Sequence, residues 1–209
     1  MPGRFVTFEG GEGAGKSTQL KRLAETLRAQ GQLVVTTREP GGAPGAEFLR
    51  GILLSGEHDW SPSAEMFLHF AARAEHVART IKPALARGDW VLCDRFFDST
   101  MAYQGFGQGA DRAAIATLSA MIGATPDLTL ILEVRETIAR SRLAARGLAD
   151  DRYDRLGPAF HARVAEGFRQ IAAAAPARCA PIDANGTAET VAADIWRTIQ
   201  ARLITPAFA

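Results

Sequence analysis

Hydrophobic and polar residues are arranged along this chain in blocks that alternate between two periods. The segment 4–9, RFVTFE, is rich in aromatic and β-branched residues and ends in a cluster of glycines. This composition predicts a buried strand that leads into a tight loop. Leucine and alanine then recur at three- and four-residue spacing through 20–27. That period predicts a helix that begins near Gly15 and packs one apolar face on a sheet.

The rest of the chain repeats this order of strand and helix. Further strands are predicted at 33–37, 90–93, 128–134 and 179–183. Helices are predicted near 46–54, 63–87, 112–123, 136–145, 158–175 and 188–203. The second of these carries Ser61 or Ser63 as N-cap and is interrupted by Pro83. Because parallel strands need crossover connections, the alternation predicts an α/β domain with a largely parallel sheet and helices on both faces. We expect a single domain, 1–209, with a lid at about 146–155, where the chain is polar and rich in arginine.

The composition gives the chain no overall charge that would attract nucleic acid or an anionic membrane. Lys and Arg total 24 against 23 for Asp and Glu, a net charge of +1, so a bound anion needs a local site. Apolar runs such as 128–132 are far shorter than the roughly 20 residues of a membrane-spanning helix. The N-terminus lacks the pattern of a secretory signal, and Cys93 and Cys179 form no CxxC pair. We therefore expect a cytoplasmic protein with two buried, reduced thiols.

The strongest motif is the glycine-rich segment that follows the first predicted strand. Gly10, Gly15, Lys16 and Ser17 fit GxxxxGK[ST] between a strand and a helix, which is the context that a phosphate-binding P-loop requires. Glycines adopt backbone angles closed to other residues, so successive N–H groups can surround a phosphate. Lys16 can neutralise the β- and γ-phosphates, and Ser17 can join the shell of Mg²⁺. ATP or GTP with Mg²⁺ is implied. The expected nucleotide contacts are Gly10, Gly11, Glu12, Gly13, Ala14, Gly15, Lys16, Ser17 and Thr18.

A P-loop does not by itself name a reaction, since kinases, GTPases and motor ATPases share it. Asp94 follows the strand 90–93 and can face the metal ion beside the P-loop. Arg95 comes next, and the alternation of a strand end sends its side chain elsewhere, where it can serve a second anion. A regulatory GTPase would need a guanine-reading NKxD tetrapeptide, which this sequence lacks. A kinase for a nucleoside or for another monophosphate stays open as an alternative.

Further segments combine with the P-loop into a family pattern. They are FEGGEGAGKST at 8–18, TREPGG at 37–42, FAAR at 70–73, DRFFDST at 94–100 and AYQG at 102–105. Together they closely resemble the thymidylate kinases, over nearly the whole chain, and DR…S…AYQG distinguishes these from other nucleoside monophosphate kinases. The resemblance implies a P-loop fold with a five-stranded parallel sheet flanked by helices, and a homodimer. It also implies transfer of the ATP γ-phosphate to dTMP in dTTP synthesis.

The resemblance assigns roles at the acceptor phosphate and sugar. Glu12 matches the acidic residue that contacts the sugar 3′-hydroxyl, and Arg95 matches the arginine that binds the dTMP phosphate in a planar fork. Glu39 belongs to the same phosphate region, through water or Mg²⁺. Tyr103 matches the tyrosine whose ring fills the space of a ribose 2′-hydroxyl. We therefore expect selection of deoxyribose by exclusion.

At the base, the resemblance implies contacts from Arg73, Gln104, Arg50 and Ser99. The family commonly has Phe four residues before this arginine, to stack on thymine, but this chain has His69 there and Phe70 next. An imidazole can also lie flat on a base. Either His69 stacks, or a small rotation of the helix brings Phe70 onto the base. Helix geometry favours His69, since residues four apart share a face.

Phosphoryl transfer needs further cations near the moving group. Lys16 is the cation of the P-loop, whereas Arg142, Arg146, Arg152 and Arg155 gather near the predicted lid. This resembles the bacterial subtype of the family, which keeps its catalytic arginine in the lid. We expect Arg146 and Arg152 at the γ-phosphate, with Arg142 as a further ATP contact. Closure of the lid would exclude water. No general base is needed, because the dTMP phosphate is already anionic.

Overall fold

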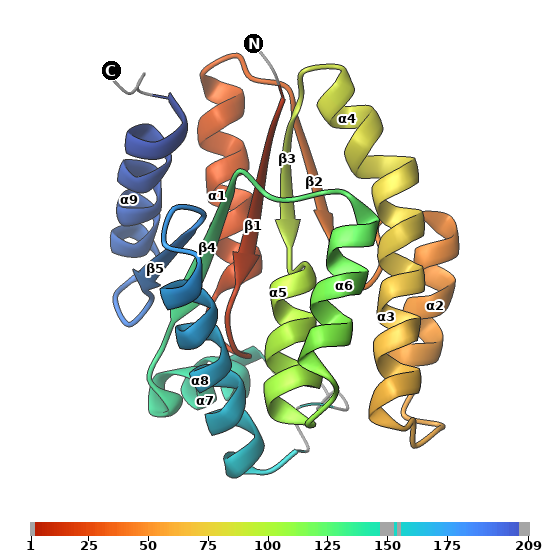
Figure 1. Ribbon diagram of the computed structural model, residues 1–209. Coiled ribbons are helices and arrows are strands. Elements are labelled where there is room, and N and C mark those ends of the chain that lie inside the picture. Colours follow the sequence, from red (N-terminus) through yellow and green to blue (C-terminus); the bar gives the residue numbers. More distant parts are fainter. Residues whose placement is uncertain (1–2, 147–152, 154–155, 205–209) are drawn as a thin grey trace.

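A five-stranded parallel sheet lies at the centre of the molecule. The computed structural model describes residues 3–146, 153 and 156–204. The strands are β1 (Arg4–Glu9), β2 (Val34–Arg38), β3 (Trp90–Asp94), β4 (Leu128–Glu133) and β5 (Cys179–Asp183), in the order β2-β3-β1-β4-β5. All neighbouring pairs are parallel, so the carboxyl ends of the strands meet at one edge of the sheet (Figure 1). The predicted fold class is confirmed, and ligands of such sheets bind at this edge.

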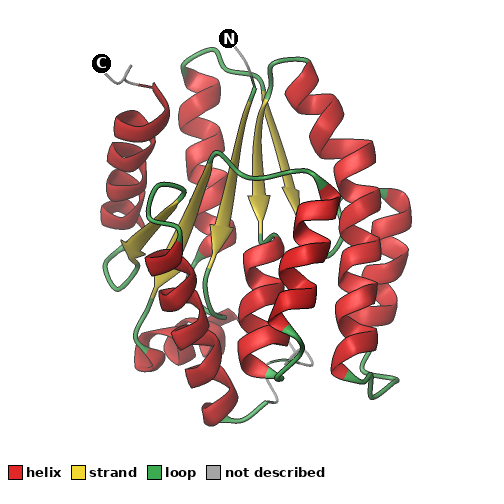
Figure 2. Cartoon of the chain, in the orientation of Figure 1, coloured by secondary structure: helices red, strands yellow, loops and turns green. Residues whose placement is uncertain are grey.

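Helices cover both faces of the sheet (Figure 2). On one face, α1 (Lys16–Ala29) and α9 (Ala188–Ile199) pack on a core that includes Val6, Phe8 and Leu130. The opposite face, with Phe5 and Ile131, packs under η1 (Val77–Ile81), α4 (Lys82–Ala86), η2 (Met101–Gly107) and α8 (Pro158–Ala174). Neighbouring residues of β1 thus enter different cores, as the two-residue period of a strand requires. The strands β1, β3 and β4 are buried on both faces, which explains why they read as nearly continuous apolar runs.

The long helical segment predicted at 63–87 forms α3 (Pro62–His76), η1 and α4 in succession. Ser61 is its N-cap, since the Ser61 Oγ accepts a hydrogen bond from the Ala64 N–H at 3.3 Å. Pro83 does not interrupt the segment, contrary to the sequence expectation. It lies in the first turn of α4, directly after the π-helical turn η1, where a missing N–H is tolerated.

The sequence pattern missed α5 (Phe97–Thr100) and η2, which follow β3 directly. Most of their residues are buried, so no polar face reveals the helical period. The remaining helices are α2 (Pro44–Leu54), α6 (Arg112–Ile122), α7 (Glu136–Arg146) and η3 (Gln200–Ile204). The predicted lid lies largely outside the described residues, although Tyr153 is described and buried. Within the described parts of the chain, no helix is both long and apolar enough to span a membrane.

Candidate active site

The P-loop runs from the end of β1 to the start of α1 and is shaped by close contacts with its neighbours. Gly10 has φ +128°, and a Cβ there would lie 2.4 Å from the Leu132 carbonyl oxygen of β4. Gly13 has φ +70°, and its Cβ would lie 2.6 Å from the Ala139 oxygen of α7. Any side chain at either position would both strain the backbone and collide with another backbone segment. These two glycines therefore fix the path of the loop around the N-terminus of α1.

Lys16 is buried inside this loop and bonds to its backbone. Its Nζ donates hydrogen bonds to the carbonyl oxygens of Gly10 at 3.1 Å and Gly11 at 2.8 Å. Burial lowers the pKa of Lys16, and the charge of Arg95 lowers it further, against the opposing effect of Glu12. The ammonium group thus donates to uncharged carbonyl oxygens. Charged phosphate oxygens can replace these as acceptors.

Ser17 and Asp94 bring two oxygen groups together beside the P-loop. The Ser17 Oγ donates to the Asp94 Oδ2 at 2.6 Å, although the two residues come from α1 and the end of β3. A hydroxyl and a carboxylate fit Mg²⁺, which binds through few protein oxygens and keeps waters and substrate phosphates in its shell. No group of three or more His, Cys, Asp or Glu side chains that could hold a metal occurs among the described residues. The pair therefore suits a metal ion whose coordination shell is completed by a bound nucleotide.

Arg95 joins the P-loop to the wall of a neighbouring cavity. It is a non-glycine residue with φ +70°, a left-handed conformation that few side chains adopt. Its Nη1 donates to the Gly10 oxygen and to the Ser99 Oγ, both at 3.1 Å. Its Nη2 bonds to Glu12 and to the Tyr103 hydroxyl. Burial opposes the charge, but the neighbouring acids, Glu12 above all, raise the pKa of Arg95 above its ordinary value.

Glu12 stays ionised although it is largely enclosed. Burial favours its neutral form, but Arg95 and then Lys16 outweigh burial and lower the pKa of Glu12 from 4.5 to about 2. The Tyr103 hydroxyl also donates to Glu12, at 3.0 Å. Burial is the main cause that raises the pKa of Tyr103, so the phenol remains a hydrogen-bond donor. A carboxylate, a phenol and a guanidinium thus form one fixed cluster at the mouth of the P-loop.

The cluster opens into a cavity of about 280 Å³. Every residue predicted on the dTMP side except Phe70 lines it, together with Ser17 and Asp94. These residues are Glu12, Glu39, Arg50, His69, Arg73, Arg95, Ser99, Tyr103 and Gln104. Residues that the sequence did not suggest complete the lining: Arg38, Pro40, Leu54, Phe96 and Tyr153. The fold therefore brings cationic, acidic, aromatic and amide side chains around a single space.

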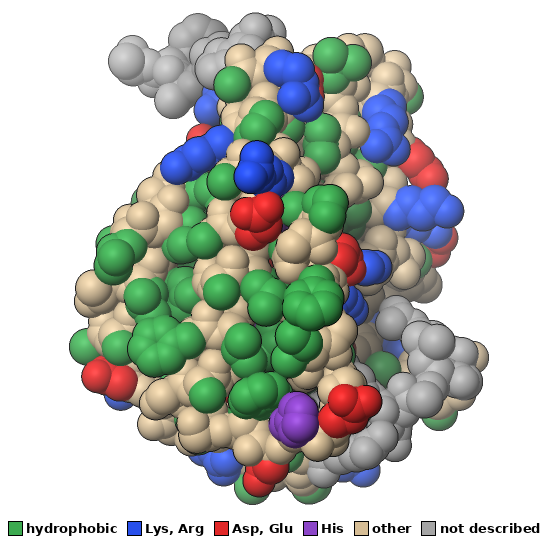
Figure 3. Space-filling model, turned by 90° about the vertical axis from the view of Figure 1, so that its right-hand side faces the viewer, with side chains coloured by type: hydrophobic (Ala, Val, Ile, Leu, Met, Phe, Trp, Pro, Cys, Tyr) green, Lys and Arg blue, Asp and Glu red, His purple; other side chains and the backbone are tan. Residues whose placement is uncertain are grey.

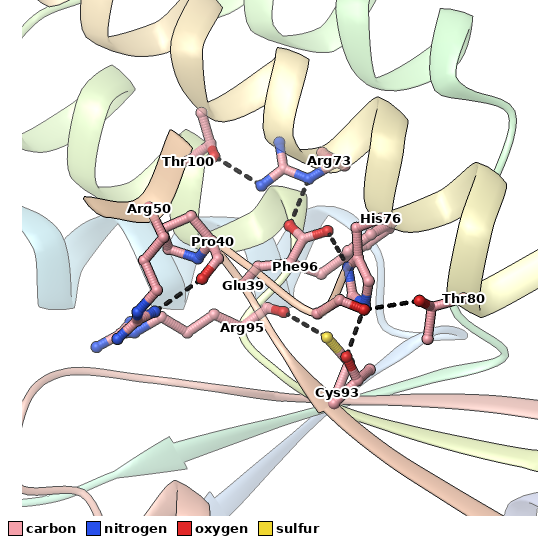
Figure 4. A network of polar contacts seen from close by, with 12 residues as sticks. Glu39, Pro40, Arg50, Arg73, His76, Thr80, Cys93, Arg95, Phe96 and Thr100 are labelled. Atoms are coloured by element: carbon pink, nitrogen blue, oxygen red, sulfur yellow. Dashed lines mark hydrogen bonds and ion pairs between the residues drawn. The ribbon is translucent and has the colours of Figure 1, made fainter. Parts of the chain in front are cut away.

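A buried ion-pair network holds Arg73 in the cavity wall (Figure 4). The Arg73 Nε donates to the Glu39 Oε2 at 2.7 Å, and Nη2 donates to the Thr100 Oγ1 at 3.0 Å. His76 Nδ1 lies 2.9 Å from the other Glu39 oxygen, and its Nε2 lies 2.7 Å from the Thr37 Oγ1. The Arg73 Nη1 is buried and bonds to no described residue. The Glu39 carboxylate is thus engaged by Arg73 and His76 at the cavity wall, and its expected role near the acceptor phosphate stays a prediction.

A second buried network surrounds Glu65, which the sequence analysis did not single out. Glu65 Oε1 accepts from the Gln104 Nε2 at 2.7 Å, the Gln108 Nε2 at 3.0 Å and the Tyr153 hydroxyl at 2.7 Å. The Tyr153 oxygen also lies 3.1 Å from the His69 Nε2 and 3.1 Å from the Gln104 Nε2. These contacts orient the amide and the imidazole that face the cavity.

The alternatives for the stacking residue are separated by position. His69 lines the cavity, whereas Phe70 packs in a core cluster with Met66 and Ile115. The Phe70 ring does not line the cavity and lies 4.8 Å from the Arg73 guanidinium, measured to its centroid. The rotation that would bring Phe70 onto a base is therefore absent from the structure.

Of the remaining predicted arginines, two have side chains that the structure describes and two do not. The Arg50 Nη1 donates to the Pro40 oxygen at 2.7 Å on the cavity rim. The Arg142 Nη2 donates to the Gly186 oxygen at 3.0 Å, and its Nη1 lies 4.0 Å from the place of a Cβ on Gly15, beside the P-loop. The side chain of Arg146 and the whole of Arg152 lie outside the described residues.

In this geometry, one arginine joins a P-loop to a neighbouring cavity. The chain can now be compared with known proteins. The family model described as thymidylate kinase matches residues 8–195. The chain belongs to the thymidylate kinase family. It is 54% identical over 197 residues to a thymidylate kinase of Rhizorhabdus wittichii, with 92% of this chain and 95% of that one covered. A thymidylate kinase of Gluconobacter oxydans is 50% identical over 205 residues, with 96% of each covered. The crystal structure of a thymidylate kinase from Ehrlichia chaffeensis has a TM-score of 0.78 at 34% identity, with 96% of this chain and 100% of that chain covered.

Several buried polar residues of this thymidylate kinase family member escaped the sequence analysis. They are Glu9, Glu65, His76, Thr100 and Tyr153. The available signal was a charged residue inside an apolar segment, as at Glu9 in RFVTFE. Glu9 accepts from the Phe96 N–H at 2.7 Å and from the Ser99 Oγ, and burial, with the nearby Asp98, raises the pKa of Glu9 to about 8. These groups support the side chains that line the cavity.

Proposed function

We propose that the P-loop binds ATP and that the cavity beside it binds dTMP, with Arg95 at the junction of the two sites. Membership of the family gives the reaction itself, phosphorylation of dTMP to dTDP in dTTP synthesis with ATP as donor. One observation carries the placement of the substrates: Arg95 bonds to the P-loop at Gly10 and to the cavity wall at Ser99 and Tyr103. An anion on this guanidinium lies next to both sites.

At the donor end, the proposal assigns the phosphates of ATP to the loop amides and to Lys16. The two carbonyl contacts of Lys16 would be exchanged for β- and γ-phosphate oxygens, which are stronger acceptors because they are charged. Arg142, beside Gly15, is a further ATP contact in this proposal. The lid arginines Arg146 and Arg152 complete the catalytic set.

Ser17 and Asp94 are the proposed protein ligands of Mg²⁺. When bound, the ion would neutralise part of the charge on the phosphates. Apart from the ion, Lys16 and Arg95 supply cations on either side of the transferred group. Because phosphoryl transfer depends on positioning and charge neutralisation, these residues provide what the reaction requires.

At the acceptor end, each wall of the cavity has a proposed role. Arg95 orients the dTMP phosphate, which needs no general base because it is already anionic. Glu12, with its pKa of about 2, is ionised at neutral pH and can accept a hydrogen bond from the 3′-hydroxyl. The buried Tyr103 ring excludes a 2′-hydroxyl, which would select deoxyribose.

The base is proposed to lie between His69 and the polar wall. His69 stacks on the ring in this arrangement, while the unpartnered Arg73 Nη1 and the Gln104 amide bond to its edge. Arg50 and Ser99, which also line the cavity, complete the base side.

We also propose that the chain is a single domain, 1–209, that forms a homodimer in the cytoplasm. Figure 3 looks onto the side where α2 and α3 lie and displays many hydrophobic side chains there. Phe48 on α2 is 72% exposed and Phe67 on α3 is 58% exposed. Large exposed apolar side chains gathered on one face favour association with another protein surface, here a second copy. The unpaired, buried Cys93 and Cys179 fit a reducing compartment.

A coupled ADP-release assay with ATP and Mg²⁺ tests the proposal, with dTMP, dUMP, UMP, thymidine and water compared as acceptors. We expect rapid ADP release with dTMP, much slower release with UMP, and release near background with thymidine or water. Equal rates with dTMP and UMP would contradict the role of Tyr103. Rapid release with thymidine would contradict the placement of an acceptor phosphate on Arg95.

A further inference from the structure

The Gln104 side chain has one orientation that its neighbours allow. Glu65 Oε1 receives three donors, from Gln104, Gln108 and Tyr153, so this oxygen acts as an acceptor. The Tyr153 hydroxyl gives its proton to Glu65 and can only accept from the Gln104 Nε2. If the amide were turned over, its oxygen would face two oxygens with no proton between them. The amide nitrogen must therefore point to Glu65.

The consequence appears on the cavity side of Gln104. With Nε2 held by Glu65, the Gln104 Oε1 points away from the network, and no described residue donates a hydrogen bond to it. Gln104 lines the cavity, so this oxygen is offered there as an acceptor. Arg73 lines the same cavity, and its buried Nη1 is a donor without a described partner. In Figure 4, dashed lines join Arg73 to Glu39 and Thr100 alone.

One acceptor and one donor that line the same cavity favour a base edge with the complementary pair. The imide of thymine or uracil carries a ring N–H beside a carbonyl and matches both groups. Cytosine carries an unprotonated ring nitrogen beside an amino group. Its ring nitrogen would then face the Gln104 oxygen, acceptor against acceptor, and its amino group would face the Arg73 N–H, donor against donor. A site built to form a hydrogen bond rejects an analogue that cannot form it, because the buried groups of the site are then left unpaired.

We propose that Glu65 is the positioning residue that makes the cavity select a thymine-type imide over cytosine, by holding the Gln104 amide with its oxygen toward the base. This inference rests on the proposed placement of dTMP in the cavity. Glu65 acts through Gln104 and does not touch the base itself. Tyr153, from the segment of the predicted lid, completes the hold on the amide.

Glu65→Gln tests the proposal, because an amide at this position can present either its nitrogen or its oxygen to Gln104. The Gln104 amide then loses its fixed orientation. We expect the ratio of the dCMP inhibition constant to the KM for dTMP to fall about tenfold, the size of one lost hydrogen-bond preference. The KM for dTMP should carry most of the change, and kcat at saturating dTMP should change less than threefold.

Glu75→Gln is the matched control, since it makes the same change on the same helix at a partly exposed side chain whose ion-pair partner among the described residues is Arg79. It should leave the ratio unchanged. Circular dichroism and thermal unfolding establish that each variant is folded. If Glu65→Gln does not fold, Tyr153→Phe decides, because it removes the hydroxyl from the network and keeps the ring. We expect the ratio to fall about threefold in this milder variant.

A purely structural role for Glu65 would weaken dTMP and dCMP equally and leave their ratio unchanged, and this result would overturn the proposal. An unchanged ratio in a folded Glu65→Gln variant, or in Tyr153→Phe if that variant decides, has the same meaning. Failure of the underlying placement looks different. In that case dCMP would bind to the unaltered enzyme about as tightly as dTMP.

Discussion

At the P-loop end of the site, Lys16 bonds to residues that are close in the sequence, whereas the cavity end is held by bonds between distant residues. Lys16 reaches carbonyl oxygens five and six residues away. Arg73 and Glu39 are 34 residues apart, and Tyr153 and Glu65 are 88 apart. The backbone contacts of Lys16 are therefore a property of one segment, while the ion pairs and networks of the acceptor end exist only in the assembled fold.

The two ends also balance their charges differently. Lys16 donates its hydrogen bonds to uncharged backbone oxygens. A bound anion can therefore pair with its charge. Arg73 is paired with Glu39 deep in the protein, where an unpaired charge is costly. A change at the donor end should therefore affect turnover with little effect on folding. A change at the acceptor end should affect both.

The largest expected effect comes from Lys16→Ala. We expect kcat to fall about a thousandfold, because a main cation on the transferred phosphate is lost. The free energy of unfolding should change by less than about 1 kcal/mol, since the lost bonds go to loop carbonyls. The coupled ADP-release assay and urea unfolding measure the two quantities. Lys21→Ala, on an exposed position of the same helix, is the control and should alter neither. A near-normal kcat in the Lys16 variant would remove this residue from the mechanism.

Glu39→Gln tests the acceptor end, where we expect a substitution to affect both folding and substrate binding. The substitution leaves the Arg73 guanidinium buried without its ionised partner, which lowers the free energy of unfolding by about 3 kcal/mol. The KM for dTMP should rise, because Arg73 then adopts more than one position. Urea unfolding and steady-state kinetics measure both changes. As a control, Glu47→Gln breaks an exposed ion pair with Arg38 and should cost less than about 1 kcal/mol. Equal costs for the two variants would show that burial does not strengthen the Glu39 pair.

Glu12 sharpens the comparison, since it lies in the P-loop but bonds to Arg95 and Tyr103 of the acceptor end. Its folded-state pKa of about 2 lies below its ordinary 4.5, so its contribution to stability is complete above pH 4.5. That contribution is lost as the pH falls from 4.5 toward 2. We expect Glu12→Gln to be less stable than the unaltered chain by about 2 kcal/mol at pH 7.

The difference between these two proteins should shrink below pH 4.5, and urea unfolding between pH 7 and pH 3 measures it. Glu25→Gln, at an exposed position on α1, should give no pH-dependent difference. A constant difference at every pH would mean that Glu12 is not held ionised by Arg95 and Lys16.

Much of the donor end could be predicted from the sequence. The glycines of the P-loop, Lys16 and Ser17 occur at a fixed spacing that the backbone itself requires. Asp94 was placed correctly beside Ser17 because parallel strands end at one edge of the sheet. Arg95 was expected to point elsewhere than Asp94, but its left-handed backbone, which aims it back at Gly10, has no signal in the sequence.

The acceptor end shows where prediction from the sequence stops. The expected place of Glu39 near the acceptor phosphate stays a prediction, but its partners Arg73 and His76 could not be read from the sequence. His69 and Phe70 could not be separated until the packing of α3 placed one in the cavity and the other in a core. Glu65 gave no signal, because a single glutamate in an amphipathic helix resembles any solvent-facing residue.

The sequence by itself determined the alternation of strands and helices, apart from α5 and η2, and the phosphate-binding loop. Both depend on periodicity and glycine spacing, which act over a few residues. Only the tertiary structure decided which side chains pair across the cavity, as Glu65 with Tyr153 and Glu39 with His76. Such pairs form between elements far apart in the chain, and burial makes each of them strong when complete and costly when broken. Their partners are therefore set by packing, which local sequence does not encode.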